Sequence, residues 1–169
     1  CAVAAGITGE RGIIIDINKM CKDIEYYLSD THITKGIDEF LDYLKCSSMT
    51  VERFSSCVKR VHDRIDIMAA NELYDPFFLD YARNLYTVTV VDTASAFSQT
   101  SREFFRMADA VVIVLSQLKT VTKQLEEYRH LYEEPADKTV FIVNRYRKDL
   151  SYGLVDIKSD LEKIGFKRN

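Results

Sequence analysis

Polar residues stand at the ends of four apolar stretches of the sequence, and their side chains are of the kinds that hold cations, phosphates or bases. The pairs are Asp16 with Asn18, Asp92 with Thr93, Ser116 with Gln117, and Asn144 with Arg145. An aspartate that projects from a rigid strand into a crevice can lie near a hydrated magnesium ion, whose charge keeps the carboxyl group ionised. Each aspartate alone could equally cap a helix or form a turn, so the four ends together carry the prediction of a ligand crevice.

The elements that must position these side chains are strands and helices in alternation. Near-continuous β-branched runs predict strands buried on both faces, at residues 12–16, 86–92, 110–115 and 139–144, with a weaker run at 64–69. Helical spacing predicts helices over residues 50–61, 77–85, 101–108, 120–132 and 154–164, with Thr50 as an N-cap and Gly165 after the last helix. This order predicts an α/β fold, an open and mostly parallel sheet with helices on both faces. Ligands bind such a sheet at the carboxyl ends of its strands.

The composition of the chain is that of a globular domain and argues against a membrane-spanning or nucleic-acid-binding protein. The chain has 169 residues with 47% hydrophobic and 29% charged residues and a net charge of -3, so we expect a single globular domain over residues 1–169. No apolar run is long enough for a membrane span, and no basic field favours nucleic acid. The basic and aromatic residues at 144–148 are interpreted as a solvated loop. The four cysteines, at positions 1, 21, 46 and 57, show no metal-ligand spacing and are expected to be reduced thiols.

A phosphate cradle cannot be found in these residues. Neither the glycine-rich loop with Lys and Ser/Thr nor the dinucleotide-binding glycine motif occurs. The only glycine-rich patch, residues 6–12, is better explained as a turn from a helix into a strand. Residues 1–8 have the composition of the end of a helix, and we interpret the chain as a piece of a longer protein.

Several stretches of the sequence resemble the MinD/ParA-type ATPases. Residues 86–117 follow that family's order of an apolar strand, Asp-Thr, a switch loop, a helix and an Ala-Asp-x-Val-Val-Ile-Val strand. Residues 9–18 resemble its second strand, and residues 1–8 the end of the helix after its phosphate loop. Residues 36–41 and 64–76 resemble a short helix and a later strand with its loop, and residues 140–166 are similar to the TadZ/CpaE branch of pilus-assembly and polar-localisation proteins.

This resemblance implies a P-loop-type sheet, without its first strand and phosphate loop here, that binds ATP with Mg and dimerises. It makes Asp92 the Walker B carboxylate, which acts on magnesium through water, and Thr93 the start of the switch that senses the γ-phosphate. It places Asp16 near the metal or the attacking water. It makes Asn144 a hydrogen-bonding partner of the adenine edge, with Arg145 packed beside the base.

The sequence also departs from the family's pattern. Asn18 stands where the family often has a second acid, and Ala94 and Ser95 replace the usual proline-containing switch. An amide cannot supply the negative charge of a carboxylate, so weak or absent hydrolysis is expected. Phe104 and Met107 share one helical face that favours a core position, although the family's switch helix also makes dimer contacts.

The resemblance implies an atypical ATP-binding switch for localisation or assembly, which acts as a homodimer in a pilus or secretion system. It further implies a cytoplasmic protein that can be recruited to a cell pole, often with a receiver-like domain before this one. No nucleic acid and no direct membrane insertion are expected. Two alternatives stay open: a nucleotide-independent interaction scaffold on the same fold, and a metabolic enzyme such as an amidotransferase-linked synthetase.

Overall fold

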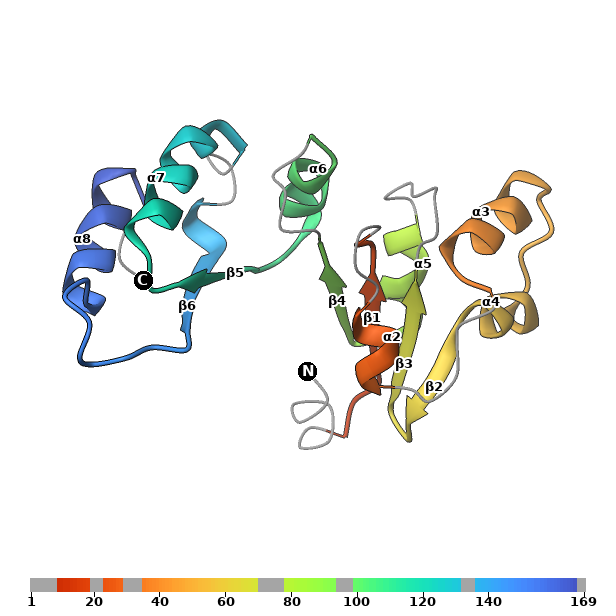
Figure 1. Cartoon of the computed structure of the whole chain (residues 1–169). Coiled ribbons are helices and arrows are strands. Elements are labelled where there is room, and N and C mark those ends of the chain that lie inside the picture. The colour runs from red at the N-terminus through yellow and green to blue at the C-terminus, as the bar shows by residue number, and fades with distance from the viewer. Residues whose placement is uncertain are drawn as a thin grey trace. The chain divides into compact units, whose positions relative to one another are not determined.

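The computed structural model describes residues 9–18, 23–28, 35–69, 78–93, 99–131 and 136–166, and it confirms the predicted α/β class with a mostly parallel sheet (Figure 1). The chain divides into two compact units, Cys1–Ser95 and Ala96–Asn169. Each unit is described by itself below. The single domain expected over residues 1–169 stays a prediction.

The first unit is built on a four-stranded sheet. Its strands are β1 (Gly12–Asp16), β2 (Lys59–His62), β3 (Ile65–Ala69) and β4 (Val88–Asp92), in the order β2-β3-β1-β4. β1 pairs in parallel with β3 and β4, whereas β2 pairs antiparallel with β3. Burial of the isoleucines in β1 and β3 stabilises the sheet, since each fully buried isoleucine contributes about 1.5–3 kcal/mol.

The described part of the first unit also contains the helices α2 (Asp23–Leu28), α3 (Ile37–Lys45), α4 (Val51–Cys57) and α5 (Phe78–Leu85). Phe40 of α3 is fully buried and makes edge-to-face ring contacts with Phe54 of α4 and Tyr81 of α5. These aromatic contacts hold the consecutive helices α3 and α4 together with the more distant α5 in one cluster. Gly36, directly before α3, lies so close to the carbonyl oxygen of Ala69 that a Cβ atom would stand 2.1 Å from it.

In the second unit, residues 99–131 and 136–166 form two parallel strands and three α-helices. β5 (Val111–Ser116) pairs with β6 (Thr139–Asn144), and the helices are α6 (Gln99–Met107), α7 (Lys119–Glu127) and α8 (Leu154–Lys163). Two short 3-10 helices, η1 (Arg129–Leu131) and η2 (Ala136–Lys138), lie between α7 and β6.

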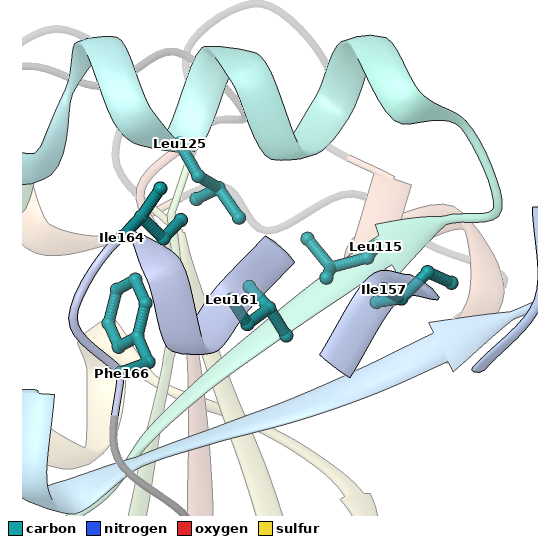
Figure 2. Close-up of a cluster of buried hydrophobic side chains, with 6 residues drawn as sticks. All are labelled: Leu115, Leu125, Ile157, Leu161, Ile164 and Phe166. Atoms are coloured by element: carbon teal, nitrogen blue, oxygen red, sulfur yellow. The ribbon is translucent and has the colours of Figure 1, made fainter. Parts of the chain in front are cut away.

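The core of the second unit joins β5 to α7 and α8, and Figure 2 shows its buried side chains converging. They are Leu115, Leu125, Ile157, Leu161, Ile164 and Phe166. Gly165 ends α8 at φ +99, and the amide nitrogens of Gly165 and Phe166 donate to the carbonyl oxygens of Glu162 and Leu161. This hydrogen-bonded end confirms the predicted role of Gly165 and turns Phe166 back onto Phe141.

Two sequence-based predictions differ from the structure. The helix predicted over residues 50–61 is wrong in its second half, because α4 ends at Cys57 and Lys59–His62 forms β2. Its N-cap is confirmed, since Thr50 Oγ1 accepts a hydrogen bond from the amide of Arg53. Burial on both faces holds for β3, where every residue is buried, but it is wrong for β4, which has no buried residue, and β5 and β6 leave alternate residues exposed.

The helix predicted over residues 120–132 is wrong in its last part, because α7 spans Lys119–Glu127 and Arg129–Leu131 forms the 3-10 helix η1. The remaining predicted helices and strands are found with small shifts at their ends. β1 and β6 begin and end at the predicted residues, and α5, α6 and α8 begin and end within two residues of the predicted bounds. Phe104 is buried, which agrees with the predicted core position, while Met107 is half-buried. Within the described residues, no helix is long and apolar enough to cross a membrane.

Candidate functional site

Two aspartates meet at the carboxyl ends of β1 and β4. The parallel register of these strands sets Asp16 directly beside Asp92. Asp16 is only 2% exposed, whereas Asp92 is exposed. Two hydrogen bonds fix the backbone directly after β1. The amide of Asn18 donates to Asp16 Oδ1 at 2.9 Å, and the amide of Ile17 donates to the carbonyl oxygen of Asp92 at 3.0 Å. The predicted neighbourhood of Asp16 and Asp92 is therefore present in the first unit.

The electrostatics of this edge favour a cation. Partial desolvation of the Asp92 carboxyl group, together with the negative charges of Asp16 and Asp23, raises its pKa above the ordinary value. A bound cation would relieve that repulsion. Among the residues that the structure describes, no three or more His, Cys, Asp or Glu side chains lie together as a metal site. The pair thus suits an ion that takes its other ligands from water and phosphate oxygens, which is how magnesium usually binds.

The predicted switch begins directly after Asp92. Thr93 is the residue after the end of β4, which is the place predicted for the start of the switch. Its side chain is half-buried. The switch residues Ala94 and Ser95 lie outside the described residues. The assignment of Thr93 to γ-phosphate sensing stays a prediction.

The second unit carries a pocket at the carboxyl ends of β5 and β6. Its volume is about 480 Å³, which is within the range of small-molecule sites. The residues that line it are Val114, Leu115, Ser116, Gln117, Leu118, Asn144, Arg145 and Leu150. Both polar strand ends predicted for this part of the chain line the same pocket, with aliphatic side chains between them. An apolar pocket with a few amide groups suits a flat heterocycle such as a nucleobase.

Asn144 and Arg145 occupy an unusual turn at this pocket. Arg145 has a φ of +53, in the left-handed region that non-glycine residues seldom adopt. Its amide donates to Asn144 Oδ1 at 2.9 Å, so the side chain of Asn144 is held against its own backbone. Strained backbone of this kind often lies at functional sites. Because Oδ1 of Asn144 is the atom that accepts this bond, the side-chain Nδ2 of Asn144 can donate to a ligand.

Sequence reasoning missed two residues of these regions. Asp23, at the start of α2, is close enough to raise the pKa of Asp92, and its only sequence signal is an acid shortly after the first strand. Gln117 was identified only as a polar strand end, but it is buried and makes three hydrogen bonds to the loop after β6. A glutamine directly after an apolar strand is a weak signal, because its partners are backbone groups.

No protein-family model and no curated protein sequence matches this chain. Solved structures do share its fold. A ParA family ATPase from Chlorobium tepidum superposes with a TM-score of 0.76 at 14% identity, covering 90% of this chain and 68% of that one. The cell division ATPase MinD of Pyrococcus furiosus gives 0.68 at 13% identity, with 95% and 70% covered.

A third similar structure is an enzyme of biosynthesis. Cobyrinic acid a,c-diamide synthase of Mycobacterium smegmatis, solved with bound ADP and magnesium, gives a TM-score of 0.61 at 11% identity and covers 95% of this chain and 72% of that one. At these identities the likeness establishes the fold, which is that of ParA- and MinD-type ATPases.

Proposed function

We propose that this protein binds ATP with magnesium and acts as an atypical, dimerising switch for localisation or assembly. The observation that carries the proposal is the Asp16–Asp92 pair, set side by side at the carboxyl edge of a parallel sheet of this fold. Two of its structural neighbours are described as ParA- and MinD-type ATPases, and a third holds ADP and magnesium.

The first unit carries the residues proposed to act on the metal. Asp92 acts on magnesium through water, and Asp16 lies near the metal or the attacking water. Magnesium, when bound, neutralises charge on the phosphates. The raised pKa of Asp92 supports this assignment, because an unfavourable pair of carboxylates at a ligand edge is commonly a site for a cation. Thr93, next along the chain, is the proposed start of the γ-phosphate sensor.

The second unit carries the residues proposed to contact the base. Asn144 donates from its amide to the edge of adenine, and Arg145 packs beside the ring. The pocket at the ends of β5 and β6 supports this part, since it places these two residues next to aliphatic side chains.

Hydrolysis is proposed to be weak or absent. Asn18 stands where a second acid would be expected, and its backbone amide is committed to Asp16 Oδ1. The side-chain amide of Asn18 carries no negative charge with which to attract a metal or polarise water. The remaining rate would come from positioning and charge stabilisation of an in-line attack.

The biological setting is proposed from the resemblance to the TadZ/CpaE branch. The protein is a cytoplasmic homodimer that works with components of a pilus or secretion apparatus and can be recruited to a cell pole. A receiver-like domain would precede this part of the chain. The likeness of residues 140–166 to that branch and the dimerisation typical of the family support this setting.

The test is a calorimetric titration of ATP into the full-length protein, with and without magnesium. Micromolar affinity that magnesium strengthens supports the switch. Asp92→Ala should weaken the magnesium-dependent part on the order of tenfold or more, because a charge-assisted contact is lost. The exposed Asp109→Ala is the matched control and should bind as the wild type does. Well-folded protein without detectable ATP binding would instead favour a scaffold that has only the fold of an ATPase.

A further inference from the structure

Gln117 is a buried amide directly after β5, and all of its hydrogen bonds go to one loop. The residue is 6% exposed. Its Nε2 donates to the carbonyl oxygens of Arg147 at 3.0 Å and Tyr152 at 2.7 Å. Its Oε1 accepts from the amide of Arg147 at 2.8 Å. The side chain thus joins the end of β5 to both sides of the segment that connects β6 to α8.

This connecting segment forms one wall of the pocket. Asn144, Arg145 and Leu150 line the pocket from it, and residues 144–151 are exposed. Exposed loop residues make few packing contacts that could hold their backbone in one place. The hydrogen bonds from Gln117 provide that constraint on the inner side of the loop.

The far end of the loop is anchored separately. Tyr152 Oη donates to Asp160 Oδ2 of α8 at 2.9 Å and lies 3.0 Å from Thr122 Oγ1 of α7. The loop is therefore tied to α7 and α8 at Tyr152 and to β5 through Gln117. A polar network whose members are all satisfied fixes a single arrangement more strongly than separate bonds do.

We propose that Gln117 is a positioning residue for the nucleobase: it holds the loop 144–152 so that Asn144 and Arg145 face the pocket. This inference rests on the proposed ATP binding and adds to it the residue that sets base affinity. Gln117 itself lines the pocket, but the three hydrogen bonds of its side chain are all made to backbone groups of the loop. It acts on the base through Asn144 and Arg145.

The experiment compares Gln117→Met with wild type in the full-length protein, using two ligands. Magnesium ATP carries the base, whereas magnesium tripolyphosphate carries the same phosphates without it. The variant should lose affinity for ATP on the order of tenfold, because the freed loop must be ordered when the base binds. Its affinity for tripolyphosphate should not change. Gln124→Met, on the exposed side of α7, is the control and should match the wild type with both ligands.

Hydrogen exchange of the unliganded protein tests the anchor independently of nucleotide. In Gln117→Met the amide of Arg147 should lose its protection, while the amides within α7 and α8 keep theirs. Equal weakening of both ligands, or unchanged ATP affinity in a folded variant, overturns the positioning role. So does a wild type that binds tripolyphosphate as tightly as ATP. A wild type that binds neither ligand contradicts the proposed ATP binding itself, and the positioning role falls with it.

Gln117→Glu offers a conservative rescue. At neutral pH its carboxylate still accepts from the Arg147 amide but faces two carbonyl oxygens with no proton to donate, so ATP affinity should fall as in Gln117→Met. Burial raises the pKa of such a carboxyl group, and at about pH 6 its protonated form can again donate to a carbonyl. ATP affinity relative to wild type should then recover for Gln117→Glu and not for Gln117→Met. The absence of any difference between the two variants at that pH would count against the hydrogen-bonding role.

Discussion

Asp16 and Asp66 are two buried carboxylates in one sheet, and their surroundings are opposite. Each is 2% exposed, Asp16 at the carboxyl end of β1 and Asp66 near the start of β3. Asp66 accepts hydrogen bonds from Arg11 at 2.9 Å, from Tyr86 Oη at 2.6 Å and from the guanidinium of Arg60. Asp16 instead stands in register with another carboxylate, Asp92.

The comparison separates a structural acid from a candidate functional one. At the amino end of the sheet, two cations and a phenol compensate the buried charge of Asp66, and that cluster links β1, β2, β3 and the residues before β4. At the carboxyl end, carboxylates lie together, and the pKa of Asp92 is raised. Two arginines compensate Asp66, whereas the like charge that stands beside Asp16 supports the proposed cation site at the carboxyl edge.

Removing the compensated charge of Asp66 should cause the largest loss of stability. Asp66→Asn exchanges one acceptor oxygen for an N–H group that faces arginine and tyrosine donors, so the free energy of unfolding should fall by about 3 kcal/mol. Urea denaturation monitored by circular dichroism measures it. Asp63→Asn, an exposed acid in the adjoining turn, should change stability by less than about 0.5 kcal/mol. An equal loss of unfolding free energy in the two variants would contradict the view that the charge of Asp66 is a compensated, structural one.

An added methyl group at Gly36, near the carboxyl edge of the sheet, should cause the next largest loss of stability. Asp16 pairs in register with Ala69, and Ala69 is the residue whose carbonyl oxygen Gly36 approaches. Gly36→Ala places a methyl group against that backbone oxygen, which should displace α3 and cost about 2 kcal/mol of unfolding free energy. The same denaturation experiment measures this cost. Wild-type stability would show that α3 does not lie tightly against this edge.

A smaller loss is expected from Tyr86→Phe, which removes one of the donors to Asp66. Burial, followed by the hydrogen bond to Asp66 and its charge, raises the pKa of Tyr86 above its usual value, so the phenol stays protonated and donates throughout the neutral range. Both arginines remain in the variant, and the unfolding free energy should fall by about 1 kcal/mol. A loss as large as that of Asp66→Asn would mean that the arginines contribute nothing.

Asp92→Asn should have the smallest effect on stability and the opposite sign. Because the pKa of Asp92 is raised by folding, its ionised form disfavours the unliganded fold above that pKa. The variant should therefore be slightly more stable than wild type at neutral pH, by less than about 1 kcal/mol since the group is solvent-screened. The difference should vanish as the pH falls from the raised folded value through the ordinary value of an aspartate. Urea midpoints measured across that range test the sign.

The sequence predicted the parts of the fold that long apolar runs dictate. The β-branched run at residues 12–16 could hardly form anything but a buried strand, and its bounds are confirmed. β2 was missed because Lys59–His62 alternates charged and apolar residues next to a helix and pairs only at the edge of the sheet. Such a strand depends on its partner β3, which local pattern does not reveal.

The candidate site was predictable where it follows from strand ends. Asp16 and Asp92 are neighbours because parallel strands bring their carboxyl ends to one edge, and Asn144 and Gln117 meet for the same reason. The Asp66 cluster was not foreseen, although a lone acid inside the apolar run at 64–69 is a signal that counter-charges must be near. Its partners Arg11, Arg60 and Tyr86 come from three other segments, and only the fold brings them together.

The most direct test of a cation–nucleotide edge is the thermal midpoint of full-length wild type and Asp92→Asn, each with and without magnesium ATP. Ligand at about 100 times its dissociation constant adds roughly 2.7 kcal/mol to the wild type, or a rise of about 5–10 °C for a domain of this size. Asp92→Asn should start at or above the wild-type midpoint and rise by much less. An equal rise in both proteins would contradict the account, because the nucleotide would then bind without using Asp92.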